Sequence, residues 1–292
     1  MNNYIITTDS TCDLPGDFYS EHQIPVLSLS CILDGETYND SHPIDEDAFY
    51  KKMRAGSMPS TSQVNPEEAK KVFEKILKEQ QADILHLAFS SGLSGSCNSA
   101  KIAAEELMEE YPGTKIVVVD TLCASMGEGL LLYKAIQQKN AGKSIDELQA
   151  WLEENKYHLC HNFTVDDLFH LHRGGRVSKA TAILGTMINI KPILHVDDEG
   201  HLINIGKTRG RKRSLIALVD RMEQQLGKYR DQNDMIMSSH GDAKEDAEFV
   251  AGLVRERFGY ETFMINYVGP VIGSHSGPGT LALFFMGNID NR

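Results

Sequence analysis

Residues 84–111, ILHLAFSSGLSGSCNSAKIAAEELMEEY, contain the pattern that decides the fold. Ile84–Phe89 is a short apolar run that predicts a buried strand, Ser90–Ser96 is a serine and glycine loop, and Ser96–Tyr111 reads as a helix. A second apolar run, Ile116–Val119, follows soon after this helix. Strand, loop, helix and strand in this order indicate a βαβ unit, and therefore a parallel sheet.

The same alternation extends through the first half of the chain. Tyr4–Thr8 reads as another buried strand, and Pro66–Gln80 and Met126–Asn140 read as helices. Ser144–Asn155 reads as a further helix, because a serine followed by acidic residues suits a helix N-terminus. We therefore expect a mainly parallel sheet with flanking helices in this half.

The second half of the chain has a different pattern. Lys191–Arg213 predicts an antiparallel hairpin, with two strands joined by a turn at residues 197–200. The other elements read as two strands around a helix, followed by a final apolar strand: Met235–Ser239, Glu261–Asn266, Ala243–Phe258 and Leu281–Met286.

This change of pattern predicts two α/β domains. Residues 1–155 would form an N-terminal domain around the parallel sheet, and residues 156–292 a C-terminal domain with a mixed sheet and helices. Glycine-rich loops occur in both halves, so we expect a ligand site at the domain interface.

Composition and charge exclude several classes of protein. The chain has 292 residues, 41% of them hydrophobic, and 41 acidic against 29 basic side chains give a formal charge of −12, which opposes binding to nucleic acid or to an anionic membrane. The first residues lack a secretory signal, and no window approaches the roughly 18 apolar residues of a spanning helix, so we expect a cytoplasmic protein. Five scattered cysteines predict reduced, buried thiols.

The loop Ser90–Ser96 is a candidate anion site. After a parallel strand, such a loop presents hydroxyls and backbone N–H groups at a helix N-terminus, where a carboxylate or a phosphate fits. A capping loop that binds no ligand is the alternative. The nucleophile elbow G-x-S-x-G fails at Ser96, and a P-loop ending at Ser144 fails at Gln137, so neither the hydrolase nor the nucleotidase motif is complete. No dinucleotide-binding motif follows a strand.

Two further loops carry polar groups. Met58–Pro66, MPSTSQVNP, places three hydroxyls before a helix, where they serve either an oxyanion or a helix cap. Gly269–Thr280, GPVIGSHSGPGT, holds His275 between two serines. A histidine in so constrained a loop donates a hydrogen bond to a carboxylate, although a core histidine bonded to backbone is the alternative. We expect the glycines around it to allow close approach of the backbone to a ligand.

Two basic clusters, Arg173–Lys179 and Lys207–Arg213, stand out against the acidic background. They are either solvated surface or sites that bind a phosphate or an acidic partner. Binding of nucleic acid is disfavoured, because no aromatic residues are interleaved with the basic ones. Histidines and acidic residues between positions 158 and 172 include metal-ligand types, but strand alternation separates neighbours, so we expect no metal site.

In their order along the chain, these motifs resemble the DegV family of bacterial fatty-acid-binding proteins. The chain departs from the pattern at Val64, where many members have a proline that would stiffen the loop. The resemblance runs almost end to end, through TDSTCDLP (8–15), TSQ (61–63), SSGLSGS (90–96), GRVS (175–178), IKPIL (190–194), RGRKR (209–213) and GPVIGSHSGPGT (269–280).

The resemblance implies a two-domain α/β fold of the DegV type that holds one long-chain fatty acid in a buried tunnel. Thr61, Ser94 and His275 would bind the carboxylate at the domain interface, with Ser62 and Gly95 beside them. It implies no cofactor and no catalytic residue, because the bound acid is the ligand.

The resemblance also implies a partner. A fatty acid kinase would phosphorylate the bound acid, and the acyl phosphate would enter phospholipid synthesis. Candidate docking residues for that kinase are Arg173, Arg176, Arg209 and Arg211. We expect a monomer, and transient contact with the membrane during loading stays open.

Two other functions stay open from the sequence. A small acyl hydrolase or transferase would use Ser94 and His275, but no base for the serine and no carboxylate to orient the histidine is evident. A regulatory protein with a purely structural lipid would never exchange its ligand.

Overall fold

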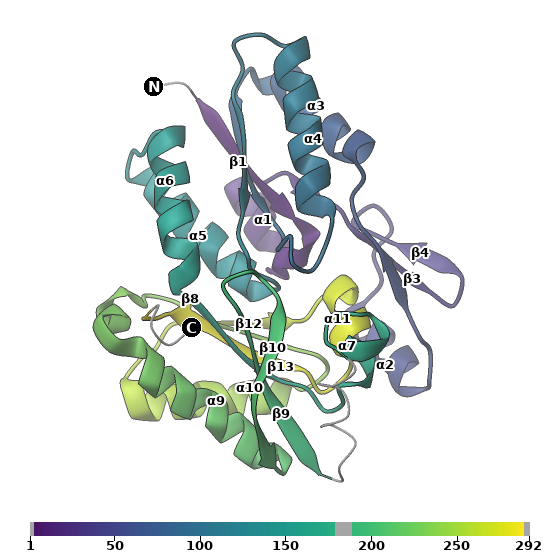
Figure 1. Ribbon diagram of the computed structural model, residues 1–292, viewed down its shortest axis with the longest axis vertical. Coiled ribbons are helices and arrows are strands. Elements are labelled where there is room, and N and C mark those ends of the chain that lie inside the picture. The colour runs from purple at the N-terminus through teal and green to yellow at the C-terminus, as the bar shows by residue number, and fades with distance from the viewer. Residues whose placement is uncertain (1–2, 179–188, 289–292) are drawn as a thin grey trace.

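Two large sheets and one small sheet form the described part of the chain, as Figure 1 shows. This computed structural model describes residues 3–178 and 189–288. The N-terminal half contains a four-stranded parallel sheet in the order β2-β1-β6-β7. Its strands are β1 (Tyr4–Asp9), β2 (Val26–Leu27), β6 (Asp83–Ala88) and β7 (Ile116–Asp120). The predicted βαβ unit is confirmed.

Helices flank this sheet where the sequence predicts them. Capping residues explain where two of these helices begin. Asn65 and Glu68 form a capping box at the start of α3, and Ser144 and Glu147 form another at the start of α6. The elements are η1 (Ser10–Cys12), α1 (Gly16–His22), α3 (Pro66–Gln80), α4 (Ser96–Glu110), α5 (Met126–Asn140) and α6 (Ile145–Asn155).

The C-terminal half contains a six-stranded sheet in the order β10-β9-β8-β13-β11-β12. All neighbours are antiparallel except β11 and β12, so the sheet is mixed, as predicted. Its strands are β8 (Leu159–Thr164), β9 (Ile190–Val196), β10 (Leu202–Arg209), β11 (Ile236–His240), β12 (Phe263–Tyr267) and β13 (Leu281–Met286). The accompanying helices are η2 (Lys156–His158), α7 (Phe169–Arg173), α9 (Arg211–Leu226), η4 (Gly227–Gln232), α10 (Lys244–Phe258) and α11 (Pro270–Ser276).

Helix α5 connects the cores of the two halves. Leu130, Leu131 and Leu132, on successive sides of the helix, are all 0% exposed. The helix contacts β6 of the parallel sheet and also β8, β11 and β13 of the mixed sheet. A helix with apolar residues on every face has to be buried on every face, and strands of both large sheets pack against α5. The proposed boundary between two domains near residue 155 stays a prediction.

One predicted strand is shorter in the structure. The strand predicted to run to Arg213 ends at Arg209, because Gly210 (φ 93°) breaks it and α9 begins at Arg211. Apolar residues at Leu215, Leu218 and Met222 then have the helical spacing that buries one face of α9.

A small three-stranded sheet and a helix were also missed. Strands β3 (Ser30–Leu33), β4 (Glu36–Tyr38) and β5 (Ser60–Ser62) pair in the order β4-β3-β5, beside α2 (Glu46–Arg54). Asp34 and Gly35 join β3 to β4 with φ angles of 54° and 84°. An Asp-Gly pair with two positive φ angles is a strong hairpin signal, so the sequence did carry it.

Among residues 3–178 and 189–288, no helix combines the length and the apolar character that crossing a bilayer requires.

Candidate functional site

A cavity of about 520 Å³ is lined by residues from both halves of the chain. Half of its lining residues are aliphatic or aromatic. Two arginines, Arg173 and Arg176, line it, and none of the described lining residues is an aspartate or a glutamate. An apolar wall with cationic groups and no acidic group suits an amphiphile with an anionic head. The apolar lining consists of Leu29, Pro59, Phe89, Leu93, Ala124, Phe163, Leu171, Val196, Leu202, Val268, Val271, Ile272, Ala282 and Phe284.

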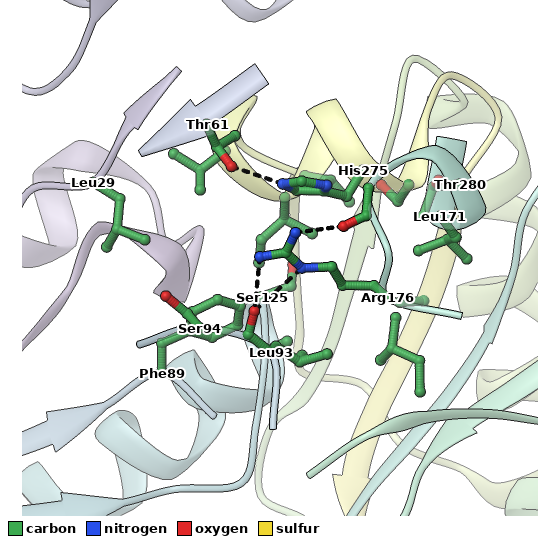
Figure 2. A pocket seen from close by; sticks show the side chains of 18 of the residues that line it. Leu29, Thr61, Phe89, Leu93, Ser94, Ser125, Leu171, Arg176, His275 and Thr280 are labelled. Carbon is green, nitrogen blue, oxygen red and sulfur yellow. Dashed lines mark hydrogen bonds between the residues drawn. The ribbon is translucent and has the colours of Figure 1, made fainter. Parts of the chain in front are cut away.

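Thr61 and His275 meet in this cavity although 214 positions separate them. Thr61 lies on β5, and its Oγ1 is 2.7 Å from His275 Nε2 on α11 (Figure 2). Burial, aided by the charges of Arg176 and Arg173, lowers the pKa of His275 to about 4, so the ring is neutral near pH 7. With its proton on Nε2, the ring donates to Thr61, and the threonine proton is left for a ligand oxygen.

Arg176 lies beside Ser94. Its Nη2 donates to the Leu93 carbonyl at 2.9 Å, its Nε donates to the same oxygen at 3.2 Å, and its Nη1 donates to Gly174 O at 2.5 Å. Ser94 is the next residue after Leu93 and lines the same cavity. Figure 2 shows the Arg176 guanidinium and the His275 ring facing one another. The site therefore combines hydroxyls and a neutral imidazole with a fixed positive charge, which the head-group residues predicted from the sequence do not include.

The 90–96 loop does not present free backbone N–H groups, as the sequence led us to expect. Ser90 O accepts from Leu93 N at 3.0 Å and from Ser94 N at 3.1 Å, and Ser90 Oγ accepts from Gly92 N at 3.2 Å. The Ser96 N–H donates to Ser94 Oγ at 3.2 Å. These amides hold the loop itself, so a ligand meets side chains here. Ser94 Oγ also lies 3.1 Å from Ser96 Oγ.

Ser62 and Gly95 occupy different environments. Ser62 is exposed, lines the cavity and has its Oγ 3.4 Å from Gln63 O. Gly95 does not belong to the lining, and its N–H donates to Gln63 Oε1 at 3.1 Å. A Cβ at Gly95 would lie 2.3 Å from that oxygen, so the glycine allows Gln63 to pack on the loop. Its contact with a ligand stays a prediction.

The four arginines predicted to dock a kinase fall into two groups. Arg173 and Arg176 line the cavity, and Arg173 Nη2 donates to Ser274 O at 3.0 Å. Arg209 is exposed at the end of β10, whereas Arg211 pairs with Asp246 Oδ2 at 2.7 Å. Lys179, the last residue of the first basic cluster, lies outside the described residues.

Glycines of the 269–280 segment allow side chains of other segments to pack against its backbone, and the close approach of a ligand to them stays a prediction. This segment forms α11 and a turn, with His275 in the last helical turn. A Cβ at Gly273 would lie 2.5 Å from Tyr50 Oη, and one at Gly277 would lie 2.4 Å from His170 Cδ2. Gly174, on the facing segment, would place a Cβ 2.1 Å from His275 Nδ1. Gly174 therefore makes room for the His275 ring, whereas Gly273 and Gly277 make room for Tyr50 and His170.

The inner wall of the cavity carries polar residues that the sequence analysis did not select. Ser125 precedes α5 and Ser239 lies on β11, and their Oγ atoms are 2.8 Å apart. Ser125 Oγ also lies 2.5 Å from Oδ2 of the buried Asp13. Burial raises the pKa of Asp13 to about 8, against the opposing effect of its hydrogen bonds from Ser125 and Gly269. Asp13 lies in the TDSTCDLP stretch, the one signal for this cluster in the sequence.

The geometry does not fit a serine hydrolase built on Ser94 and His275. Nε2 of the histidine contacts Thr61, and Nδ1, the atom that an orienting carboxylate would hold, has no hydrogen-bond partner among the described residues. Among the described residues, Ser94 Oγ hydrogen-bonds to the hydroxyl and the backbone N–H of Ser96 and to no general base. A nucleophile needs a base that is itself oriented, and this arrangement provides neither.

Comparison with known proteins agrees with this architecture. The model of the DegV family, described as uncharacterised proteins, matches residues 3–288. A DegV domain-containing protein of Clostridium perfringens is 48% identical over 292 residues, which cover 99% of each chain. A DegV family protein from Thermus thermophilus, described with fatty acid binding, is similar in structure with a TM-score of 0.85, 31% identity and coverage of 98% of this chain and 100% of that one. DegV of Bacillus subtilis, described as a fatty acid binding protein, gives a TM-score of 0.84 with 28% identity, covering 99% of this chain and 100% of its own. The chain studied here therefore belongs to the DegV family.

Proposed function

We propose that this protein binds one long-chain fatty acid in the cavity, with the carboxylate at Thr61, Ser94, His275 and Arg176. The observation that carries the proposal is the cavity itself: an apolar wall, two arginines and no acidic side chain. The fatty acid binding described for the relatives from Thermus thermophilus and Bacillus subtilis supports the same ligand class.

The carboxylate would be held by hydrogen bonds from two hydroxyls and by the positive charge of Arg176. Thr61 and Ser94 offer hydroxyl protons, and Arg176 supplies a guanidinium anchored on two backbone carbonyls. Because these carbonyls already accept from Arg176, the guanidinium needs no reorganisation when the carboxylate arrives. Hydrogen bonds between charged partners are shorter and stronger than neutral ones, so this contact orients the acid.

The tail would supply most of the affinity. Burial of a methylene contributes about 0.8 kcal/mol, so a chain of about 15 methylenes contributes on the order of 12 kcal/mol before the costs of association. A wall built from residues such as Phe89, Phe163 and Phe284 provides the apolar surface for this burial.

The protein would act as the non-catalytic partner of a fatty acid kinase, as a monomer in the cytoplasm. The carboxylate oxygen would attack the γ-phosphorus of a nucleoside triphosphate held by the kinase, the bond from that phosphorus to the β–γ bridging oxygen would break, and the nucleoside diphosphate would leave. The acyl phosphate formed would pass to phospholipid synthesis. Arg209, exposed on β10, and Lys212 and Arg213, exposed on α9, provide a basic surface for an acidic partner.

Native mass spectrometry of the purified protein, followed by lipid extraction, tests the ligand. We expect one co-purifying long-chain acid, and we expect the double variant Thr61→Ala, Ser94→Ala to lose it. The matched control is Thr37→Ala, Ser41→Ala, which removes a threonine and a serine that are exposed and outside the cavity lining. Retention of the acid by the first double variant would refute the head-group assignment.

A kinase assay tests the partner. With the loaded protein, a fatty acid kinase and ATP, Arg209→Glu should slow acyl phosphate formation while the affinity for the fatty acid stays unchanged. Arg209 is the cleaner probe, because replacing Arg211 would also break its ion pair with Asp246. Equal rates for the variant and the parent would remove Arg209 from the docking surface.

A further inference from the structure

A short chain of hydrogen bonds reaches the wall of the cavity. It links Asp13, Ser125 and Ser239, which are 7%, 5% and 0% exposed. In the described part of the chain, none of these three hydrogen-bonds to the side chain of Thr61, Ser94, His275 or Arg176. Ser125 and Ser239 therefore form a second polar pair on a wall that also carries His161, Ser276 and Thr280.

Ser125 is held in an unusual conformation to place its hydroxyl there. Its φ of 54° and ψ of −146° belong to a region that glycine adopts and other residues avoid. It also stands at the N-cap of α5, where a serine side chain normally accepts from the helix backbone, and here it makes no such bond. The side chain turns instead toward Asp13 and Ser239, so the local backbone loses stability to keep this hydroxyl on the cavity wall.

The proton count leaves one donor for a ligand. Ser125 Oγ donates to the Asp13 carboxylate when Asp13 is ionised, at an O–O distance of 2.5 Å. Below about pH 8 the carboxyl holds its own proton, so it donates to Ser125 across the same contact, and the proton of Ser125 goes to Ser239. Ser239, a lining residue of the cavity, then has a proton with no acceptor among the described residues. A plain hydrocarbon tail would leave this buried donor unpaired, which is unfavourable.

We propose that Ser125 and Ser239 form a subsite for an oxygen atom on the acyl chain, so that the protein binds hydroxy fatty acids as well as unsubstituted ones. This inference rests on the proposed function, because it concerns the tail of the same ligand. A chain hydroxyl would accept from Ser239 and donate to the remaining lone pair of Ser125.

A comparison of stearic acid with a positional series of hydroxystearic acids tests the subsite. In a wholly apolar tunnel, every hydroxyl would weaken binding by about tenfold or more, because its hydrogen bonds to water are lost. We expect one position at which the hydroxy acid binds at least as tightly as stearic acid. In Ser239→Ala, that isomer should lose about tenfold in affinity while stearic acid binds as before or better.

Two further variants keep this test sharp. Ser125→Gly removes the other hydroxyl and suits the backbone, since glycine accepts a positive φ, and it should lower the affinity for the same isomer. Ser238→Ala is the matched control: Ser238 is the neighbouring buried serine on β11, its Oγ donates to Ala282 O at 2.8 Å, and it does not line the cavity. It should leave the ratio of the two affinities unchanged.

A keto acid with its oxygen at the same position adds a pH readout. Above about pH 8 the ionised Asp13 carboxylate accepts a hydrogen bond from Ser125, and Ser125 in turn accepts from Ser239. The direction of both hydrogen bonds is then reversed, and Ser239 has no proton left for a ligand. The keto acid, which only accepts, should then bind more weakly, whereas in Asp13→Asn the amide keeps donating and the pH dependence disappears. The groups whose charges bear on Asp13 or respond to it are Glu46 and Tyr50 of α2 and Tyr19 of α1, and they are the same in both proteins.

The outcomes separate this inference from the proposed function. If stearic acid itself does not bind, the proposed function fails. If stearic acid binds, but every hydroxy isomer is at least tenfold weaker and Ser239→Ala leaves those ratios unchanged, the subsite is refuted and the fatty acid site stands.

Discussion

His275 shows how the function of a side chain depends on its nearest neighbours. Thr61 holds Nε2 of the ring, and the Cα of Gly174 leaves no room beyond Nδ1. Arg176 and Arg173 add positive charge, which helps burial to keep the ring neutral. The type of residue was predictable from the sequence, but its orientation and charge were not, because they come from segments about 100 and 214 positions away.

Gly174→Ala tests the orientation of this ring. The new Cβ would meet His275 Nδ1 at 2.1 Å, so the ring must move away from Thr61. We expect about tenfold weaker fatty acid binding in a titration, the effect of losing one hydrogen bond to a charged group. Gly252→Ala, in the interior of α10 with open space around it, is the control and should leave the affinity unchanged. Unchanged binding in Gly174→Ala would show that the ring position is unimportant.

Asp13→Asn tests the protonation of the buried carboxyl through stability. Native Asp13 holds its proton up to about pH 8, whereas an unfolded aspartate loses it near pH 4. Between these values the native state binds one more proton than the unfolded state, so this group lowers stability as pH rises, by up to about 1.4 kcal/mol per pH unit. The asparagine cannot ionise, and its amide can donate to Ser125.

Urea denaturation of both proteins between pH 5 and pH 8 measures this effect. The free energy of unfolding of Asp13→Asn should rise relative to the parent as pH increases, and the two should converge at the acidic end. Asp198→Asn, in the exposed turn between β9 and β10, is the control. Parallel curves for Asp13→Asn and the parent would mean that Asp13 is ionised in the native protein.

The strands and helices were predictable where their local pattern is strong. The buried strands and the long helices of both sheets, and the β9–β10 hairpin, follow from apolar runs, periodicity and capping residues. The small sheet was missed because its strands are short, with 4, 3 and 3 residues, and β5 lies in a polar stretch. Helix α11 was read as a loop because glycine and proline are frequent in it, although Pro270 at its first turn is compatible with a helix.

The small sheet is the element that carries Thr61. Strand β5 pairs antiparallel with β3, so that Thr61 lies opposite Cys31. Strand β3 is positioned in turn by the Asp34-Gly35 turn to β4. The position of Thr61 therefore depends on a hairpin that lies about 27 residues before it in the sequence.

Gly35→Val tests this dependence. Valine at a φ of 84° is strained, and we expect the free energy of unfolding to fall by about 1–2 kcal/mol in thermal or urea denaturation. Fatty acid affinity should fall as well, because β3 supports β5. Thr37→Val, at an exposed strand position of β4 that a branched side chain suits, is the control. Full stability in Gly35→Val would contradict the proposed role of the turn.

The molecule as a whole places an apolar cavity where segments from both halves converge. The wall takes residues from β5 and the 90–96 loop in one half, and from β8, β11, β13 and α11 in the other. No local pattern can predict a cavity, because it depends on how α5 and the two large sheets pack. The family resemblance implied it, and the described structure contains a cavity of suitable lining at the expected residues.

A crystal structure of the protein with a terminally brominated long-chain fatty acid tests the central claim most directly. Anomalous scattering from the bromine would locate the end of the tail, and the electron density would locate the carboxylate. We expect the carboxylate within hydrogen-bond distance of Thr61 and Ser94 with Arg176 beside it, and the bromine among the apolar wall residues. A carboxylate found elsewhere, or a cavity closed by side chains with the acid outside it, would contradict the account.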